Sequence, residues 1–257
     1  MLKFQTKTFF AVAFVLSLVC VGCRSIPEPA FLTAKPNDNR ECSKADQIKY
    51  KALSNESAEL GWRFLFQYLN DSSFLPIFNK QSIVDSMDSF NDCWWFNNEN
   101  YQAYWGSGVV RGVQATFVDD KTLIEKYLKQ SVEFIRLAEK YNVPANQSNN
   151  LHLDLANAYN GLGAFYSQTS REKLAEVNLE QARILLLDVI KKEPKNGRAF
   201  YLLAVTSFYQ RKFEESKKEA DQALNKHFKV PDDFLKDLSN KLKNAAPSVK
   251  ANSSTRQ

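Results

Sequence analysis

The sequence predicts an all-α protein, and two observations carry that prediction. From Ser43 onward, apolar residues recur at three- and four-residue spacing, which places them on one face of a helix. Helix-favouring Leu, Ala, Lys, Glu and Gln are plentiful, whereas the 257-residue chain holds only 8 Gly and 8 Pro. So few turn-forming residues disfavour a β-sandwich or barrel. With 44% apolar and 25% charged residues, the composition is that of a water-soluble globular protein.

Helices are expected over nine segments joined by short polar links. The expected helices cover residues 44–69, 81–97, 99–117, 120–142, 148–167, 171–192, 196–211, 213–227 and 231–243. Pro144 and Pro194 stop two of them. Asp119, Ser148 and Asn196 are expected N-caps, because their short side chains accept hydrogen bonds from free backbone N–H groups. Residues 70–80 interrupt the helical spacing and are expected to form a long loop.

The first residues have the features of an export signal. Lys3 and Lys7 are followed by Thr8–Val19, a stretch without charge. A helix of that length spans about 18 Å, which is short of the ~30 Å hydrocarbon core of a membrane. The stretch therefore fits the apolar region of a cleaved signal better than a transmembrane helix.

Small residues follow this stretch, and Gly22 directly precedes Cys23. The arrangement resembles the lipobox of bacterial lipoproteins, with Cys20 where that family prefers Leu. The resemblance implies that residues 1–22 are a lipoprotein signal peptide and that Cys23 receives diacylglycerol on its sulfur and becomes the new N-terminus. Arg24, in place of the Asp that retains enteric lipoproteins in the inner membrane, favours the outer membrane of the cell envelope, facing the periplasm. Ordinary secretion, with cleavage at the same bond and no lipid, is the alternative.

Three regions are expected after the signal. Residues 23–43 are polar and proline-containing, and they are expected to form a flexible tether. Residues 44–243 are expected to form a helical domain, for which repeats are considered below, and residues 244–257 are expected to be a disordered tail. The formal charge of the whole chain is +5, and loss of Lys3 and Lys7 with the signal lowers it to +3. Because this balance is mild, no nucleic-acid partner is expected.

Two cysteines remain once Cys20 is removed and Cys23 is modified. Cys42 and Cys93 would then lie in an oxidising compartment, where a disulfide persists. A bridge closing a loop of about 50 residues would stabilise the fold by about 3–4 kcal/mol in the chain-entropy model. The alternative is that Cys93 fills a small-residue position within a helix pair while Cys42 stays free.

The clearest repeated unit begins at Gly197. Counted from that residue, Ala204, Ser216 and Ala223 occupy the eighth, twentieth and twenty-seventh places. Small residues at these places allow two helices to approach closely. The pattern resembles the tetratricopeptide repeat (TPR), a helix–turn–helix unit of 34 residues.

Three further units are expected upstream. One contains Gly163 and carries about seven extra residues between its helices, near residues 167–170. Another has Gly108 at its eighth place, and a degenerate first unit carries Gly61. The chain as a whole resembles a bacterial TPR lipoprotein. The resemblance implies a right-handed superhelical solenoid of TPR-like helical hairpins, with the helix at 231–243 as a C-terminal cap.

An aromatic cluster spans one helix–helix junction. Trp94 and Trp95 end one expected helix, and Tyr101, Tyr104 and Trp105 begin the next. Burial in the core is the first interpretation, because aromatic side chains cover much area. Neighbouring residues on a helix point about 100° apart, so Trp94 and Trp95 cannot both face the same side. The cluster is therefore also the candidate partner groove, where an extended peptide or a helix would bind.

The sequence lacks the patterns that catalysis and metal binding require. Its two histidines, His152 and His227, lie far apart and belong to no metal-spaced pair. No motif of a zinc protease, a serine hydrolase or a nucleotide-binding loop occurs. Gly106, Gly108 and Gly112 are spaced like part of a phosphate-binding set, but they lie within an expected helix, where close packing explains them. We expect no catalytic residue, metal or cofactor, and the chain is not expected to be an enzyme.

The resemblance implies a function in protein–protein interaction. An envelope-anchored TPR lipoprotein would act as a non-catalytic scaffold in the periplasm. It would bind periplasmic or outer-membrane proteins or peptides and would hold to the membrane through its lipid. The alternative is an accessory lipoprotein that binds a small ligand in association with a solute transporter. An enclosed apolar pocket near Trp95 and Trp105 would favour the ligand, and an open groove would favour a peptide.

Overall fold

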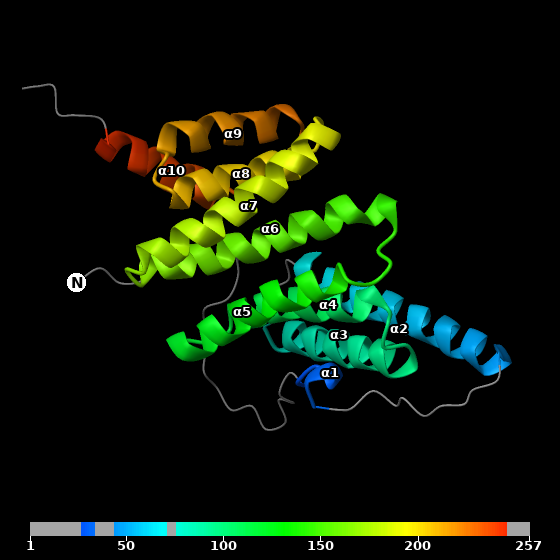
Figure 1. Ribbon diagram of the computed structural model, residues 1–257. Helices are drawn as coiled ribbons and strands as arrows, with labels where there is room; N and C mark the ends of the chain where they lie inside the picture. The colour runs from blue at the N-terminus through cyan, green and yellow to red at the C-terminus, as the bar shows by residue number, and fades with distance from the viewer. Residues whose placement is uncertain (1–26, 34–43, 71–75, 246–257) are drawn as a thin grey trace, which may run out of the picture.

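The computed structural model describes residues 27–33, 44–70 and 76–245, and all regular elements in those ranges are helices (Figure 1). This confirms the all-α prediction. The helices are α1 (Ala30–Thr33), α2 (Lys44–Asn70), α3 (Pro76–Phe96), α4 (Tyr101–Gln114), α5 (Lys121–Ala138), α6 (Ala145–Gln168), α7 (Glu172–Lys192), α8 (Gly197–Tyr209), α9 (Phe213–Asn225) and α10 (Asp232–Ala245).

Several helix boundaries differ from the sequence prediction, and the largest difference is at the start of α3. Helix α3 begins at Pro76, within the segment that was expected to be a loop. Proline suits the first position of a helix, because its missing N–H would have no partner there and its φ is already helical. At the other end of the chain, α10 continues to Ala245, two residues into the expected disordered tail. The predicted signal peptide and Cys23 lie outside the described residues.

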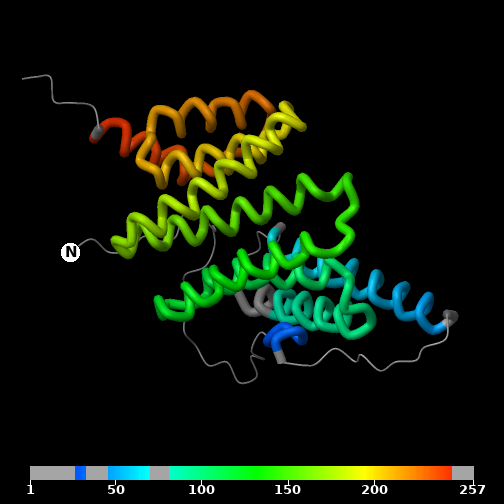
Figure 2. The backbone as a smooth tube through the Cα atoms, in the orientation of Figure 1, coloured from blue at the N-terminus to red at the C-terminus, as the bar shows by residue number. Residues whose placement is uncertain are grey.

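Eight of the helices form four hairpins, α2–α3, α4–α5, α6–α7 and α8–α9, which stack in chain order (Figures 1 and 2). The second helix of each hairpin contacts the first helix of the next one, and α10 packs against α9. The first helices also contact one another in order, α2 with α4, α4 with α6 and α6 with α8. Each hairpin therefore packs against its neighbours in the stack.

The four hairpins share one arrangement at the seam between their two helices. The first helix contributes a buried glycine or alanine, and the second contributes three buried residues at spacings of four and then three. The sets are Gly61 with Ser86, Phe90 and Cys93; Gly108 with Ser131, Ile135 and Ala138; Gly163 with Ala175, Leu179 and Ala182; and Ala204 with Ser216, Ala220 and Ala223. One packing unit therefore recurs four times along the chain.

Small residues are needed at the seam because the two helices nearly touch there. A Cβ on Gly108 would lie 2.6 Å from Ile135 Cγ1, and a Cβ on Gly163 would lie 2.7 Å from Leu179 Cγ. In the last hairpin, the Ser216 hydroxyl donates to the carbonyl oxygen of the facing Ala204 at 2.7 Å. Close contact of this kind excludes water along the seam and fixes the register of the two helices.

The link between α6 and α7 corrects one detail of the repeat prediction. No seven-residue excess occurs there, since the link is residues 169–171, as short as the link at 210–212 in the next hairpin. The extra length lies in the helices themselves, 24 and 21 residues in α6 and α7 against 13 in each of α8 and α9. Ser170 and Arg211 adopt positive φ values of 58° and 63° at the equivalent point of each link. This left-handed conformation is the usual way to end a helix and start its antiparallel partner.

Residues 27–33 pack against the helical body. The Ala30 N–H donates to Asn91 Oδ1 on α3 at 2.7 Å, and Glu28 forms an ion pair with the buried Arg111 on α4. Their partners lie 61 and 83 residues further along the chain. This part of the chain therefore belongs to the folded domain.

The sequence predicted a flexible tether here, and for residues 27–33 the structure differs. A polar, proline-containing stretch without helical spacing is typical of a spacer, and nothing local distinguishes it from a docked segment. The rest of the expected tether, residues 23–26 and 34–43, lies outside the described residues.

The seam predicts the effect of one added methyl group. Gly108→Ala places a Cβ against Ile135 and the α5 backbone, so we expect a loss of about 1–3 kcal/mol in the free energy of unfolding measured with urea. Gly161→Ala is the matched control, because its Cβ meets only the flexible end of Leu128 at 3.2 Å. The control should be neutral or slightly stabilising, since alanine favours helix over glycine. Equal stability of the two variants would contradict the conclusion that close contact at the seam requires glycine at position 108.

Candidate functional site

The structure divides the predicted aromatic cluster. Trp94, Tyr104 and Trp105 are buried, Tyr101 is half-buried, and Trp95 is 44% exposed. The prediction that Trp94 and Trp95 face different sides is confirmed. The five side chains nevertheless do not form one exposed surface, because Trp94, Tyr104 and Trp105 are all buried.

Trp94 and Tyr104 belong to the core. The Trp94 Nε1–H donates to the Tyr104 hydroxyl at 3.0 Å, and that hydroxyl donates to the Asn98 carbonyl oxygen at 2.7 Å. The Tyr104 and Tyr141 rings stack with centroids 4.8 Å apart. Burial raises the pKa of Tyr104 far above its ordinary value, so the phenol remains protonated and serves as a neutral hydrogen-bonding group.

A row of aromatic and polar side chains crosses the first helices of all four hairpins. It consists of Trp62 on α2, Gln102 and Trp105 on α4, Asp154 on α6 and Arg198 on α8, and we call it the inner row. The Trp62 Nε1–H donates to Gln102 Oε1 at 3.1 Å, and the Trp62 and Trp105 rings meet edge to face at 5.0 Å. These contacts connect the first hairpin to the second.

The second half of the inner row is charged. The Trp105 Nε1–H donates to Asp154 Oδ2 at 2.9 Å, and the other carboxylate oxygen of Asp154 pairs with Arg198. Asp154 is 16% exposed and Arg198 is 40% exposed, so the guanidinium keeps an open side. Beside the row, the Tyr101 hydroxyl donates to Gln147 Oε1 on α6 at 2.6 Å. Trp105 itself is buried, so the accessible groups of the inner row are those of the half-buried Trp62 and Gln102 and of Arg198.

Sequence inspection identified Trp105 and missed most of the inner row. Trp62, Gln102, Asp154 and Arg198 carry no local motif. A signal was nonetheless present, because Trp62 directly follows the seam glycine of its hairpin and Trp105 precedes its seam glycine by three positions. Aligning the hairpins on their small seam residues would have placed both side chains near one face of the first helices.

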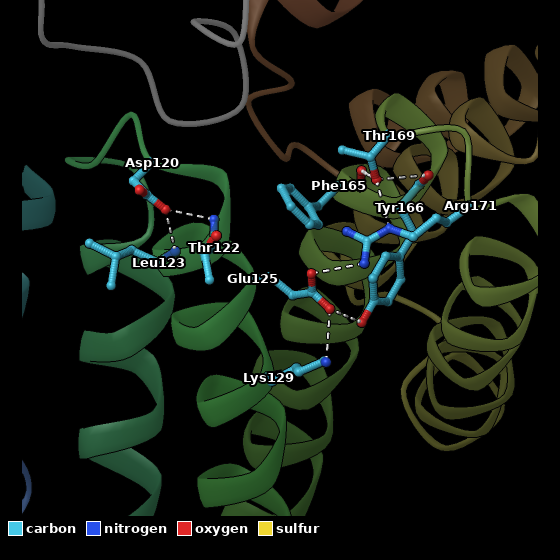
Figure 3. Close-up of polar contacts among 9 residues, drawn as sticks. All are labelled: Asp120, Thr122, Leu123, Glu125, Lys129, Phe165, Tyr166, Thr169 and Arg171. Atoms are coloured by element: carbon cyan, nitrogen blue, oxygen red, sulfur yellow. Dashed lines mark hydrogen bonds and ion pairs between the residues drawn. The ribbon is translucent and has the colours of Figure 1, made fainter.

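A second polar cluster joins α5 to the link between α6 and α7 (Figure 3). Glu125 pairs with Lys129 and with Arg171, each at 2.8 Å, and it accepts a hydrogen bond from the Tyr166 hydroxyl at 3.2 Å. The Arg171 guanidinium also lies 4.5 Å from the centroid of the Tyr166 ring. The hydrogen bond from Lys129, followed by that from Arg171, lowers the pKa of Glu125 to about 2. With every charge paired, the cluster acts as a structural clamp between hairpins.

Cys93 is a free thiol in a closed environment. It is the last of the three seam residues of α3, and its side chain is 0% exposed. The sulfur lies 3.4 Å from Ser54 Oγ, and burial raises the pKa of the thiol to about 12. These features agree with the alternative in which Cys93 fills a small-residue position. The predicted partner Cys42 lies outside the described residues.

The described ranges show the surroundings of both histidines and of Gly106. Within the described ranges, no group of His, Cys, Asp and Glu is placed to hold a metal ion. His152 lies 3.5 Å from a carboxylate oxygen of Glu139. His227 lies in the link between α9 and α10 and has a φ of 60°. Gly106 faces the Phe90 ring so closely that a Cβ would lie 2.1 Å from it, which confirms close packing as the reason for glycine there.

Comparison with family models, with curated proteins and with solved structures returned no match. The described helices include none that is both long and apolar enough to cross a bilayer. The proposed function is therefore inferred from the sequence and the geometry of this chain alone.

The buried thiol predicts slow alkylation. In a Cys42→Ser variant at neutral pH, Cys93 should react with iodoacetamide far more slowly in the native protein than in denaturant, because the thiolate is both scarce and inaccessible. Intact mass reports the number of alkyl groups. In the wild-type chain unfolded in denaturant, two groups added only after reduction would reveal a bridge between Cys42 and Cys93 and would contradict the free thiol.

The Glu125 cluster predicts a specific pH dependence. Its folded pKa is depressed, so the stability it contributes is present above the ordinary value of 4.5 and is lost as the pH falls toward about 2. Glu125→Gln should therefore lower the free energy of unfolding at pH 7 by about 1–2 kcal/mol after allowance for solvent screening. Near pH 2 the variant and wild type should match. Glu133→Gln, on the exposed side of the same helix, should show no such pH-dependent difference.

Proposed function

We propose that the chain is a TPR-like lipoprotein of the bacterial envelope that acts as a non-catalytic scaffold. The repeated seam supports the repeat architecture, because four hairpins use the same small-residue spacing and the first helix of each hairpin contacts the first helix of the next. The α10 helix fits a terminal cap. It covers the last hairpin with Phe234 and Leu238, both buried, and it turns charged residues outward.

The envelope location rests on the N-terminal sequence. The basic start, the short apolar stretch and Gly22–Cys23 support export and lipidation at Cys23. Two or more acyl chains hold a protein to a bilayer stably without a transmembrane helix. Arg24 supports the outer membrane, and the domain would then face the periplasm.

The inner row is the observation that carries the binding function. It runs across four hairpins, and a surface of that extent suits an extended peptide or a helix better than a compact molecule. Tryptophan and arginine are the residues that dominate protein interfaces, because they combine large apolar area with directional hydrogen bonds. The half-exposed Arg198 adds a positive group that favours an acidic or carboxylate-bearing partner.

The small-ligand alternative has weaker support. At the junction where an enclosed pocket would favour it, the Trp105 ring contacts Trp62 at 5.0 Å and stacks on Tyr101 at 6.3 Å. Its indole N–H is already bonded to Asp154. Rings therefore fill the junction, and the open polar side of the inner row favours a macromolecular partner.

Native mass spectrometry of the protein extracted gently from its own envelope tests the scaffold. We expect a partner protein at fixed ratio that is lost when Gln102→Ala and Arg198→Ala are combined, because both side chains face the partner. The matched control combines Arg211→Ala and Gln222→Ala, which alter the same residue types at exposed positions outside the inner row. Thermal unfolding checks that both variants fold.

Each outcome separates the two functions. Loss of the partner with the inner-row variant alone supports the scaffold. Equal retention in both variants contradicts the inner row as the binding surface. A lone protein that carries a bound small molecule would favour ligand capture.

A further inference from the structure

The chain is fixed to the folded domain very soon after the proposed lipid site. Glu28, the fifth residue after Cys23, already pairs with Arg111. Five extended residues reach at most about 17 Å. A long tether would let the domain turn freely above the bilayer. A tether of five residues would instead keep the docked side of the domain close to a lipid on Cys23.

The docked segment is held by a buried charge and by aromatic contacts. The Arg111 side chain is 0% exposed, and its guanidinium lies 5.1 Å from the Tyr127 ring centroid and pairs with Glu28. A buried cation without its carboxylate would be costly, so release of the segment is opposed. The Phe31 ring adds contacts at 4.8 Å to the rings of Tyr104 and Phe134.

The segment lies on a different side of the domain from the inner row. On α4, Tyr104 and Arg111 contact the segment, whereas Gln102 and Trp105 contact α2 and α6. Successive residues of a helix point about 100° apart, so these two pairs occupy different faces of α4. The segment also contacts α3 through two bonds with Asn91 and approaches α5, and Figure 1 shows α1 beside α3.

We infer that residues 27–33 orient the domain on the membrane, with the outer side of α3 and α5 toward the lipid headgroups and the inner row away from them. This inference rests on the proposed lipidation of Cys23. We assign the membrane as the occupant of that side because a reach of about 17 Å keeps the docked segment close to a lipid on Cys23. Leu32 within the segment and Lys126, which pairs with Glu28, are exposed. Trp95 and Leu123 are also exposed, and they lie one helical turn from the contact residues Asn91 and Lys126 on the same helix faces. This mixture of side chains suits an interfacial position.

Energy transfer from single dyes to acceptor-labelled headgroups tests the orientation. The dye is placed on Leu123→Cys, at the membrane side, or on Gln102→Cys, in the inner row, in the lipidated Cys42→Ser protein reconstituted in vesicles. Cys93 does not interfere, because it is fully buried. We expect higher transfer at residue 123 than at residue 102.

A lengthened tether provides the matched comparison without disturbing the buried ion pair. A Gly-Ser spacer of about 15 residues, inserted after Arg24, spans roughly 20 Å on average and should abolish most of the difference between the two dyes. The same spacer inserted after Ser248, at the opposite end of the chain, should leave the difference intact.

The outcomes distinguish the orientation from the anchor. Intact mass first shows whether Cys23 carries diacylglycerol, and its absence overturns the anchor and, with it, the orientation. Lipidated protein with equal transfer at the two positions overturns the orientation and leaves the anchor standing. If the difference in energy transfer between residues 123 and 102 survives in the protein with the longer tether, the inferred orientation is also overturned. The short tether would then not be the cause of the difference.

Discussion

Close approach of two helices at each hairpin seam is the constraint on which the rest of the structure depends. A glycine or alanine on the first helix faces small or tightly fitted residues on the second, so the backbones meet at a distance that larger side chains would forbid. Because the same spacing recurs in four hairpins, successive hairpins present similar surfaces to each other and stack in chain order. The alignment of first helices that forms the inner row is a consequence of that stacking.

The seams and the inner row place different demands on their residues. Seam positions such as Gly108 and Ala182 are selected by volume alone, and they offer nothing to a partner. The inner row instead combines rings with groups that can still form bonds, as in the pair of Asp154 and the half-exposed Arg198. The seam residues and the accessible groups of the inner row therefore occupy different faces of the same helices, so the groups of the row can vary while the packing at the seams is kept.

The docked segment links the end of the chain to its core. Arg111 is fully buried, and a charge in that position needs a carboxylate, which Glu28 supplies. A bond made for electrostatic reasons also limits how far the domain can move from whatever holds the N-terminus. Under the proposed lipidation of Cys23, this ion pair would act together with the Asn91 bonds and the Phe31 ring contacts to hold the segment and its side of the domain near the membrane.

The sequence by itself determined the helical class, the short spacing of small residues and the opposite sides of Trp94 and Trp95, because each follows from neighbours along one chain segment. Only the tertiary structure decided the inner row, the helical start at Pro76 and the docking of Glu28. The contacts of Asp154 and Arg111 join residues tens of positions apart, and no local spacing records which of them meet. Local periodicity fixes the elements, whereas packing at the seams selects the distant partners.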